Sequence, residues 1–192
     1  MNSSKQGMSI KFLDFLISII ILIFCSPIML VMFFLGFFFF QNPFFLNKRL
    51  GLNKKPFFII KFRSLPIGTP IVPTHELSKP SNNIYGNFIR KTKLDELPQF
   101  INVLLGSMSI VGPRPCLLSQ SSLISLREKN NLFSIKPGIT GVAQIEKIDM
   151  NQEKLLVKKE KEMVRNNSLK NYLNVILRTI MVVSNSFYDK RS

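Results

Sequence analysis

Two neighbouring carboxylates are the residues of this chain best suited to chemistry. Acidic residues are scarce, with 11 among 192 residues, and Asp95-Glu96 is the only adjacent pair. Arg90, Lys91 and Lys93 come just before the pair, where a helix is predicted to begin. A helix start and nearby cations favour ionised carboxylates and attract phosphate. An ionised carboxylate can attack phosphorus, or can bind Mg²⁺ while substrate phosphates supply other ligands.

Basic side chains that can hold a diphosphate occur elsewhere in the sequence. Lys61 and Arg63 share one face of a predicted strand, and Arg114 is fixed between two prolines. Arginine suits bidentate recognition of phosphate, and lysine supplies a point charge. Each feature alone is weak evidence, because a chain of net charge +15 has basic residues in many turns. Likewise, the acidic pair alone is explained by the preference of first helical turns for Asp and Glu.

Short elements must position these side chains. Residues 56–64 are predicted to form a strand, and residues 66–83, which contain four prolines, a loop. Residues 108–111 form a short buried stretch. Rigid turns rich in Gly and Pro are predicted at 112–115 and 137–141.

The acidic pair falls in a segment with helical spacing of its apolar residues. This spacing predicts a helix from Thr92 to Leu105, with Thr92 as its N-cap and Gly106 as its stop. Pro98 predicts an irregular start. After Glu153 the sequence predicts basic amphipathic helices, which suit either a membrane surface or core packing.

A long apolar segment precedes this body. No charged residue occurs from Phe15 to Asn47, which exceeds the length of a signal peptide and the roughly 20 residues that cross a bilayer. Ser26-Pro27 lies near the middle and predicts a break or kink, with the serine bonding to a backbone carbonyl that the proline frees. Basic residues flank both ends, which favours a re-entrant hairpin with both ends cytoplasmic. A kinked single-pass anchor is the alternative.

Charge and cysteine content narrow the class of protein. Residues 1–47 carry a net charge of +1 and the remainder +14, which places the body in the cytoplasm against an anionic leaflet. Such a surplus suits lipid headgroups, a polyanionic substrate, or both. Cys25, Cys116 and the single His75 make neither a disulfide framework nor a zinc site, and they fit a reducing compartment.

The order of the motifs is more specific than any one of them. The segments KFRS, RKTKLDELPQFINVLLGSMSIVGPRP and KPGITGVAQ closely resemble the bacterial sugar transferases, the monotopic phosphoglycosyl transferase family. Ser26-Pro27 matches the re-entrant membrane helix of that family. The resemblance runs from about Ile10 to Ser184. Departures such as Ser107, Val142 and Glu160 leave the acidic pair intact and bear on sugar identity rather than reaction class.

The resemblance implies a reaction and a role for each site residue. Such enzymes transfer a sugar 1-phosphate from a UDP-sugar to a polyprenol (undecaprenyl) phosphate, release UMP and begin a surface glycan. Asp95 matches the nucleophile that forms a phosphosugar-enzyme intermediate, and Glu96 matches the residue that holds Mg²⁺. Lys61, Arg90 and Arg114 match positions around the phosphates.

These observations predict an α+β protein, mostly helical with short strands. Residues 1–47 form a tail and re-entrant membrane helix, and residues 48–192 a cytoplasmic transferase domain with surface helices, at the bacterial inner membrane. Its partners are a UDP-sugar, polyprenol phosphate and membrane lipids. A non-enzymatic basic membrane adaptor is the first alternative, and the intact acidic pair argues against it. A nucleic-acid-binding module is the second, but Trp is absent and most Phe lie in the apolar segment.

Overall fold

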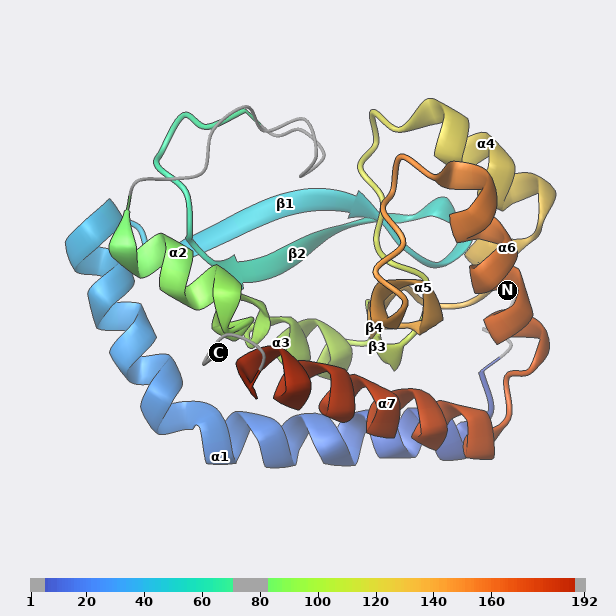
Figure 1. The fold of residues 1–192 in the computed structure, drawn as a ribbon, viewed down its shortest axis with the longest axis horizontal. Coiled ribbons are helices and arrows are strands. Elements are labelled where there is room, and N and C mark those ends of the chain that lie inside the picture. Colours follow the sequence, from blue (N-terminus) through green and yellow to red (C-terminus); the bar gives the residue numbers. More distant parts are fainter. Residues whose placement is uncertain (1–5, 71–82, 189–192) are drawn as a thin grey trace.

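The N-terminal apolar segment forms one long helix. In a computed structural model, which describes residues 6–70 and 83–188, α1 spans Met8–Phe40 and contains Pro27. Figure 1 shows two arms of this helix that meet at a bend about midway along it. The Ser26 hydroxyl donates a 2.7 Å hydrogen bond to the carbonyl of Ile23, which is the carbonyl that lacks a donor because Pro27 has no N–H. The predicted kink and the predicted hydrogen bond of Ser26 are confirmed.

Little of α1 is covered by the rest of the protein. It is the one helix among the described residues that is long and apolar enough to cross a membrane, by length and composition. Large apolar side chains such as Phe24, Phe34 and Phe38 are exposed on it. Its second arm packs on α2 (Ile84–Lys91), where the Tyr85 hydroxyl donates to the carbonyl of Met32.

A β-hairpin crosses the molecule above α1 (Figure 1). Strands β1 (Phe44–Leu50) and β2 (Pro56–Phe62) pair antiparallel across the short turn η1 (Leu52–Lys54). The predicted strand is thus confirmed over most of its length. The chain that follows has no helix or strand as far as residue 70, in agreement with the predicted loop, whose residues 71–82 lie outside the described residues.

The segment that carries the acidic pair corrects one prediction. Instead of one helix from 92 to 105, the chain forms a 3-10 turn, η3 (Leu94–Glu96), and then α3 (Gln99–Leu104). Lys93 adopts a left-handed conformation with φ 60°, and Pro98 begins the second helix, where a missing N–H costs little. Thr92 ends α2 rather than capping the next helix, and its hydroxyl donates to the carbonyl of Phe88.

Gly106 stops α3 as predicted, with φ 76°. The buried side of α3 differs from the predicted apolar spacing, because Gln99, Asn102 and Val103 are its buried residues. Asn102 explains this orientation. Its side chain accepts from the backbone N–H of Ile60 and donates to the carbonyl of Phe58, so the amide pairs with β2 as a neighbouring strand would.

The two Gly/Pro turns meet across a short parallel sheet. Strand β3 (Ser109–Val111) pairs with β4 (Gly138–Thr140), and both bring the following turns together. Gly112 donates to the carbonyl of Thr140, and Gly138 donates to the carbonyl of Pro113. A Cβ atom added to Gly138 would lie 2.0 Å from the nitrogen of Gly112, so this approach requires glycine.

The remaining helices complete the core. Helices α4 (Ser121–Lys129), α5 (Val142–Ile145) and α6 (Glu153–Arg165), with the turn η4 (Leu132–Ser134), surround a second cluster of buried apolar residues. Between α4 and α6, Arg127 and Glu160 form a buried ion pair with two hydrogen bonds. Core packing, one of the two predicted alternatives, therefore holds for α6.

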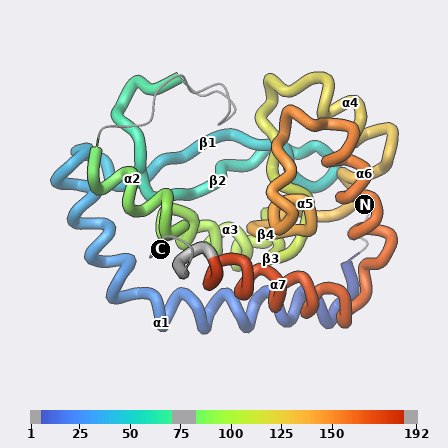
Figure 2. Tube along the Cα trace, in the orientation of Figure 1, coloured from blue at the N-terminus to red at the C-terminus, as the bar shows by residue number. Residues whose placement is uncertain are grey.

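The last helix, α7 (Leu169–Tyr188), runs beside the first arm of α1 (Figures 1 and 2). Asp14 of α1 joins the two to the sheet. Its carboxylate accepts from the Ser109 hydroxyl, the Ile110 N–H and the Tyr172 hydroxyl at 2.6–2.8 Å.

The architecture confirms the mixed helical and short-stranded class. The predicted division between residues 47 and 48 falls within β1, and it stays a prediction.

Candidate active site

All six predicted catalytic and phosphate-binding residues line one open cleft. Its volume is about 850 Å³, within the range of small-molecule sites. Seven cations and two carboxylates contribute to the lining: Arg49, Lys61, Arg63, Arg90, Lys91, Lys93, Asp95, Glu96 and Arg114. Ser26 and Pro27 lie apart from it, in α1. The excess of positive charge suits a ligand with several negative charges.

Asp95 lies in η3 and is 8% exposed. Its Oδ1 atom is buried and has no hydrogen-bond partner among the described residues. Burial, and then the neighbouring Glu96 carboxylate, raise the pKa of Asp95 to about 6 against the opposing effect of Lys61, Lys93 and Arg90. The cations lower the pKa of Asp95 as expected, but burial and Glu96 outweigh them. At pH 7 roughly nine tenths of the carboxyl groups are still ionised.

Glu96 has a different environment. Its Oε1 atom accepts a 2.6 Å hydrogen bond from the Lys61 ammonium, and both side chains are about three-quarters covered. Burial by itself would raise the pKa of Glu96, but the charge and hydrogen bond of Lys61, with Lys93 and Arg114, lower it to about 2. Glu96 is therefore a permanent anion at neutral pH.

Arg63 is engaged by the protein itself. Its Nε and one terminal nitrogen donate to the carbonyls of Asn42 and Phe44, both at 3.1 Å, and its guanidinium lies over the ring of Phe45. These contacts brace the chain between α1 and the hairpin. A phosphate-binding role for Arg63 stays a prediction. Two of the three guanidinium nitrogens already donate to backbone carbonyls.

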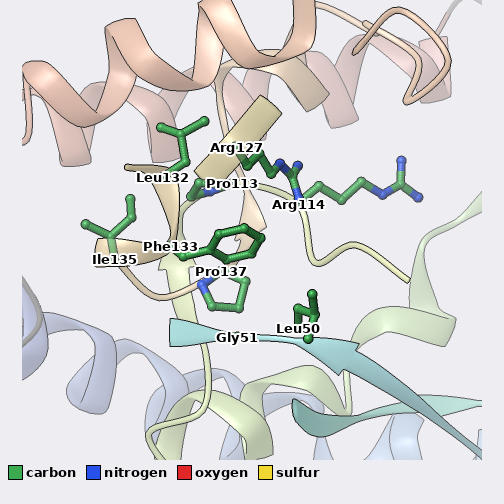
Figure 3. Close-up of a pocket in the computed structure, with 9 residues that line it drawn as sticks. All are labelled: Leu50, Gly51, Pro113, Arg114, Arg127, Leu132, Phe133, Ile135 and Pro137. Atoms are coloured by element: carbon green, nitrogen blue, oxygen red, sulfur yellow. The ribbon is translucent and has the colours of Figure 1, made fainter. Parts of the chain in front are cut away.

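Arg114 is presented by the loop that follows β3. Besides the contact of Gly138 with Pro113, the loop lies beside Glu160: the Arg114 backbone and the Arg127 guanidinium both lower the pKa of this carboxyl against the opposing effect of burial. Figure 3 shows Arg127 beside the Arg114 backbone, while the Arg114 side chain extends away from the surrounding residues. The small cavity drawn there, about 10 Å³, has room for about one water molecule.

The residues of the cleft that were not predicted as site residues include two polar side chains of β1. Asn47 and Arg49 stand two positions apart in β1 and both line the cleft. Arg49 was counted only among the basic residues that flank the apolar segment. The alternation of FFLNKRL was the available signal, because residues i and i+2 of a strand share a face.

The carboxylates of the cleft fit a magnesium ion better than a metal held by protein ligands alone. The described residues contain no group of three or more His, Cys, Asp and Glu side chains placed to hold a metal. Mg²⁺, however, commonly uses one or two carboxylates together with substrate phosphates and water. The anionic Glu96, which uses one oxygen to accept from Lys61, provides such a carboxylate.

Comparison with known proteins identifies the family. Residues 5–186 match the model of the bacterial sugar transferases. The chain belongs to this family.

The sugar transferase is similar to several characterised and uncharacterised proteins. It is 42% identical over 142 residues to UDP-glucose:undecaprenyl-phosphate glucose-1-phosphate transferase of Klebsiella pneumoniae, covering 69% of this chain and 30% of that protein. It is 34% identical over 153 residues to galactosyl transferase CpsE of Streptococcus agalactiae, covering 72% and 34%. It is 32% identical over 195 residues to exopolysaccharide production protein ExoY of Sinorhizobium fredii, covering 92% and 86%. The matches to three glucose-1-phosphate transferases span 22–30% of the length of those proteins.

Proposed function

We propose that this protein transfers a sugar 1-phosphate from a UDP-sugar to polyprenol (undecaprenyl) phosphate, releases UMP and so initiates a surface glycan. The observation that carries the proposal is the buried, unpartnered oxygen of Asp95 beside the Glu96–Lys61 ion pair in a cationic cleft. The names of the relatives, which include UDP-glucose:undecaprenyl-phosphate glucose-1-phosphate transferase, support this substrate pair.

Asp95 is the nucleophile of the first step. Its Oδ1 forms a bond to the sugar-linked phosphorus, the bridging P–O bond breaks, and the electron pair leaves with UMP. A phosphate oxygen of the polyprenol phosphate then attacks the same phosphorus, and the Asp95 carboxylate is released. The pKa of about 6 suits this role, because the carboxylate is mostly ionised yet less stabilised than an ordinary surface aspartate.

The other charges of the cleft position and neutralise the donor. Lys61 orients Glu96, while Arg90 and Arg114 reduce the repulsion between the diphosphate and the attacking carboxylate. Glu96, with oxygens of the donor diphosphate, would hold Mg²⁺. When bound, that ion supplies positive charge against the charge that develops on the phosphates.

The lipid substrate requires a membrane site. The exposed apolar side chains of α1 need a non-aqueous environment, and the bend at Ser26-Pro27 suits a helix that enters and leaves the same leaflet. Basic residues flank both ends of α1, so the cleft faces the cytoplasm at the inner membrane of a bacterium. A non-enzymatic adaptor would leave the carboxylates of the cleft without a role.

Isotope exchange tests the covalent step. Wild-type protein should exchange labelled UMP into its UDP-sugar without polyprenol phosphate, because the first step needs no acceptor. Asp95→Asn should abolish both exchange and transfer. Glu162→Gln, which removes an exposed carboxylate of α6, is the matched control. Exchange that strictly requires the lipid phosphate would instead indicate direct transfer in a ternary complex. A panel of UDP-sugars in the same assay identifies the donor.

A further inference from the structure

Arg49 is a cation of the cleft that has no counter-ion among the described residues. It projects from β1 into the cleft that contains Asp95 and Glu96. One terminal nitrogen donates to the carbonyl of Pro115 at 3.3 Å, but Nε is buried and has no partner within the described part of the chain. No carboxylate of the described residues forms an ion pair with it. A buried donor on a charged group is costly unless a ligand satisfies it.

The fold holds Arg49 close to a second arginine. Burial, and then the charge of Arg114, lower the pKa of Arg49 to about 10, so Arg49 remains cationic at neutral pH. Backbone pairing holds the segment of Arg49 against the segment that follows Arg114. The N–H of Leu50 donates to the carbonyl of Cys116, and Arg49 forms a bridge with Leu117. Two like charges in such proximity repel, and an anion bound by both relieves that repulsion.

The charges of the cleft have an order. The cations that act on Asp95 are Lys61, Lys93 and Arg90. In the hairpin, Lys61 of β2 lies opposite Phe45 of β1, and Arg49 lies four residues further along β1, about 13 Å away at about 3.3 Å per residue. Because Lys61 donates to Glu96 and Arg49 donates to Pro115, Arg49 stands beside the Arg114 loop, at the side of the cleft away from the acidic pair.

The geometry of phosphoryl transfer assigns a partner to that side. In an in-line displacement the leaving oxygen departs opposite the nucleophile. When Asp95 attacks the sugar-linked phosphorus, the nucleoside-linked phosphate therefore lies on the side of that phosphorus opposite to Asp95. That phosphate gains negative charge as the P–O bond breaks, because it leaves as a nucleoside monophosphate.

We propose that Arg49, together with Arg114, binds the nucleoside-linked phosphate of the donor and the nucleoside monophosphate that leaves. This inference rests on the proposed function. It assigns a role to Arg49 that the motifs of the sequence did not indicate, and it separates the cations into two groups. Lys61, Arg90 and Lys93 serve the reacting end of the cleft, whereas Arg49 and Arg114 serve the leaving group.

Nucleotide binding by the full-length protein in lipid nanodiscs tests the inference without turnover. Calorimetric titration with UMP and UDP compares wild type with Arg49→Lys and Arg49→Gln. Lysine keeps the charge and can still donate to Pro115, but it cannot make a bidentate contact with phosphate. We expect affinity for both nucleotides to fall by about 10-fold in Arg49→Lys and up to about 100-fold in Arg49→Gln. Lys48→Gln, at the exposed neighbouring position of β1, removes the same charge and should bind like wild type.

The outcomes separate this inference from the proposed function. A role limited to bracing the Pro115 loop would lower the midpoint of thermal unfolding of the Arg49 variants and leave their nucleotide affinity unchanged below that midpoint. This result would overturn the assignment, as would equal losses in Lys48→Gln. If the variants lose UMP affinity as expected while wild type shows no UMP exchange into a UDP-sugar, the phosphate site stands and the covalent mechanism fails.

Discussion

Asp95 and Glu96 are adjacent in sequence, yet their environments move their pKa values in opposite directions. Burial and the charge of Glu96 raise the pKa of Asp95 to about 6, whereas Lys61 lowers that of Glu96 to about 2. Such a separation assigns different roles to two similar groups. Glu96 is the stabilised anion that suits a cation, either Lys61 or Mg²⁺. Asp95 is the less stabilised anion and so the better nucleophile.

A prediction about the metal follows at this scale. Transfer should require Mg²⁺ or Mn²⁺, because Glu96 and the donor diphosphate together provide oxygen ligands. Glu96→Gln should lower kcat/KM by about 100-fold or more, the loss typical when one charge-stabilising group is removed from an active site. UMP release after metal stripping, with and without added Mg²⁺, measures the requirement. Full turnover in excess EDTA would remove the metal from the mechanism.

Among the elements, the loop of Arg114 depends on contacts distant in sequence. The carbonyl of Pro113 accepts from Gly138 in β4, and the Arg114 backbone lies beside Glu160 of α6, whose pKa it lowers. Glu160 also forms the buried ion pair with Arg127 of α4. The two helices thus fix a loop whose side chain reaches into the cleft.

Removing the charge of Glu160 should destabilise the protein. Glu160→Gln leaves the Arg127 guanidinium buried without a counter-ion, and breaking such a pair costs about 3–5 kcal/mol in the free energy of unfolding. Urea unfolding followed by circular dichroism measures the change. Glu162→Gln, exposed on the same helix, should alter it by less than about 0.5 kcal/mol. Equal stability of the two variants would show that the pair contributes nothing.

How far the sequence predicted these elements depended on whether their signal was local. The strand of residues 56–62, the buried stretch near Ser109 and the stop at Gly106 follow from local pattern and turn chemistry. The division of the predicted helix at residues 92–105 does not, because a left-handed lysine at Lys93 has no sequence signal. The residues of the cleft were predicted mainly from sequence motifs. Arg49 lay outside them, and only the three-dimensional pairing of β1 with the Arg114 loop brings it to the site.

At the scale of the whole molecule, apolar side chains remain exposed on two helices that lie beside α1. Helix α7 presents Leu169, Leu173, Leu177 and Ile180, spaced by three or four residues along one face, and α2 presents Ile84 and Phe88. The face of α7 opposite to these residues is packed inside through Tyr172 and Val175. Exposed apolar groups of this extent suit a membrane surface. These apolar residues can rest on one membrane surface, with the cleft beside the lipid phosphate, only if α1 does not cross the bilayer.

Topology is therefore the decisive property of the whole molecule. If α1 enters and leaves one leaflet, Gly7 before the helix and Lys55 in the hairpin turn face the same compartment. Cysteines introduced at these exposed positions, Gly7→Cys and Lys55→Cys, should both be shielded from an impermeant thiol reagent applied to spheroplasts. Both should label once the membrane is permeabilised. The parent chain, with Cys25 and Cys116 alone, gives the background. Labelling of Gly7→Cys but not Lys55→Cys in intact spheroplasts would mean that α1 spans the bilayer.

The variant Pro27→Leu, tested with the same pair of cysteines, provides a further comparison. Without the proline the 26 uncharged residues 15–40 would form a straight helix about 39 Å long, which exceeds the roughly 30 Å hydrocarbon core, so the variant should shift toward the spanning pattern.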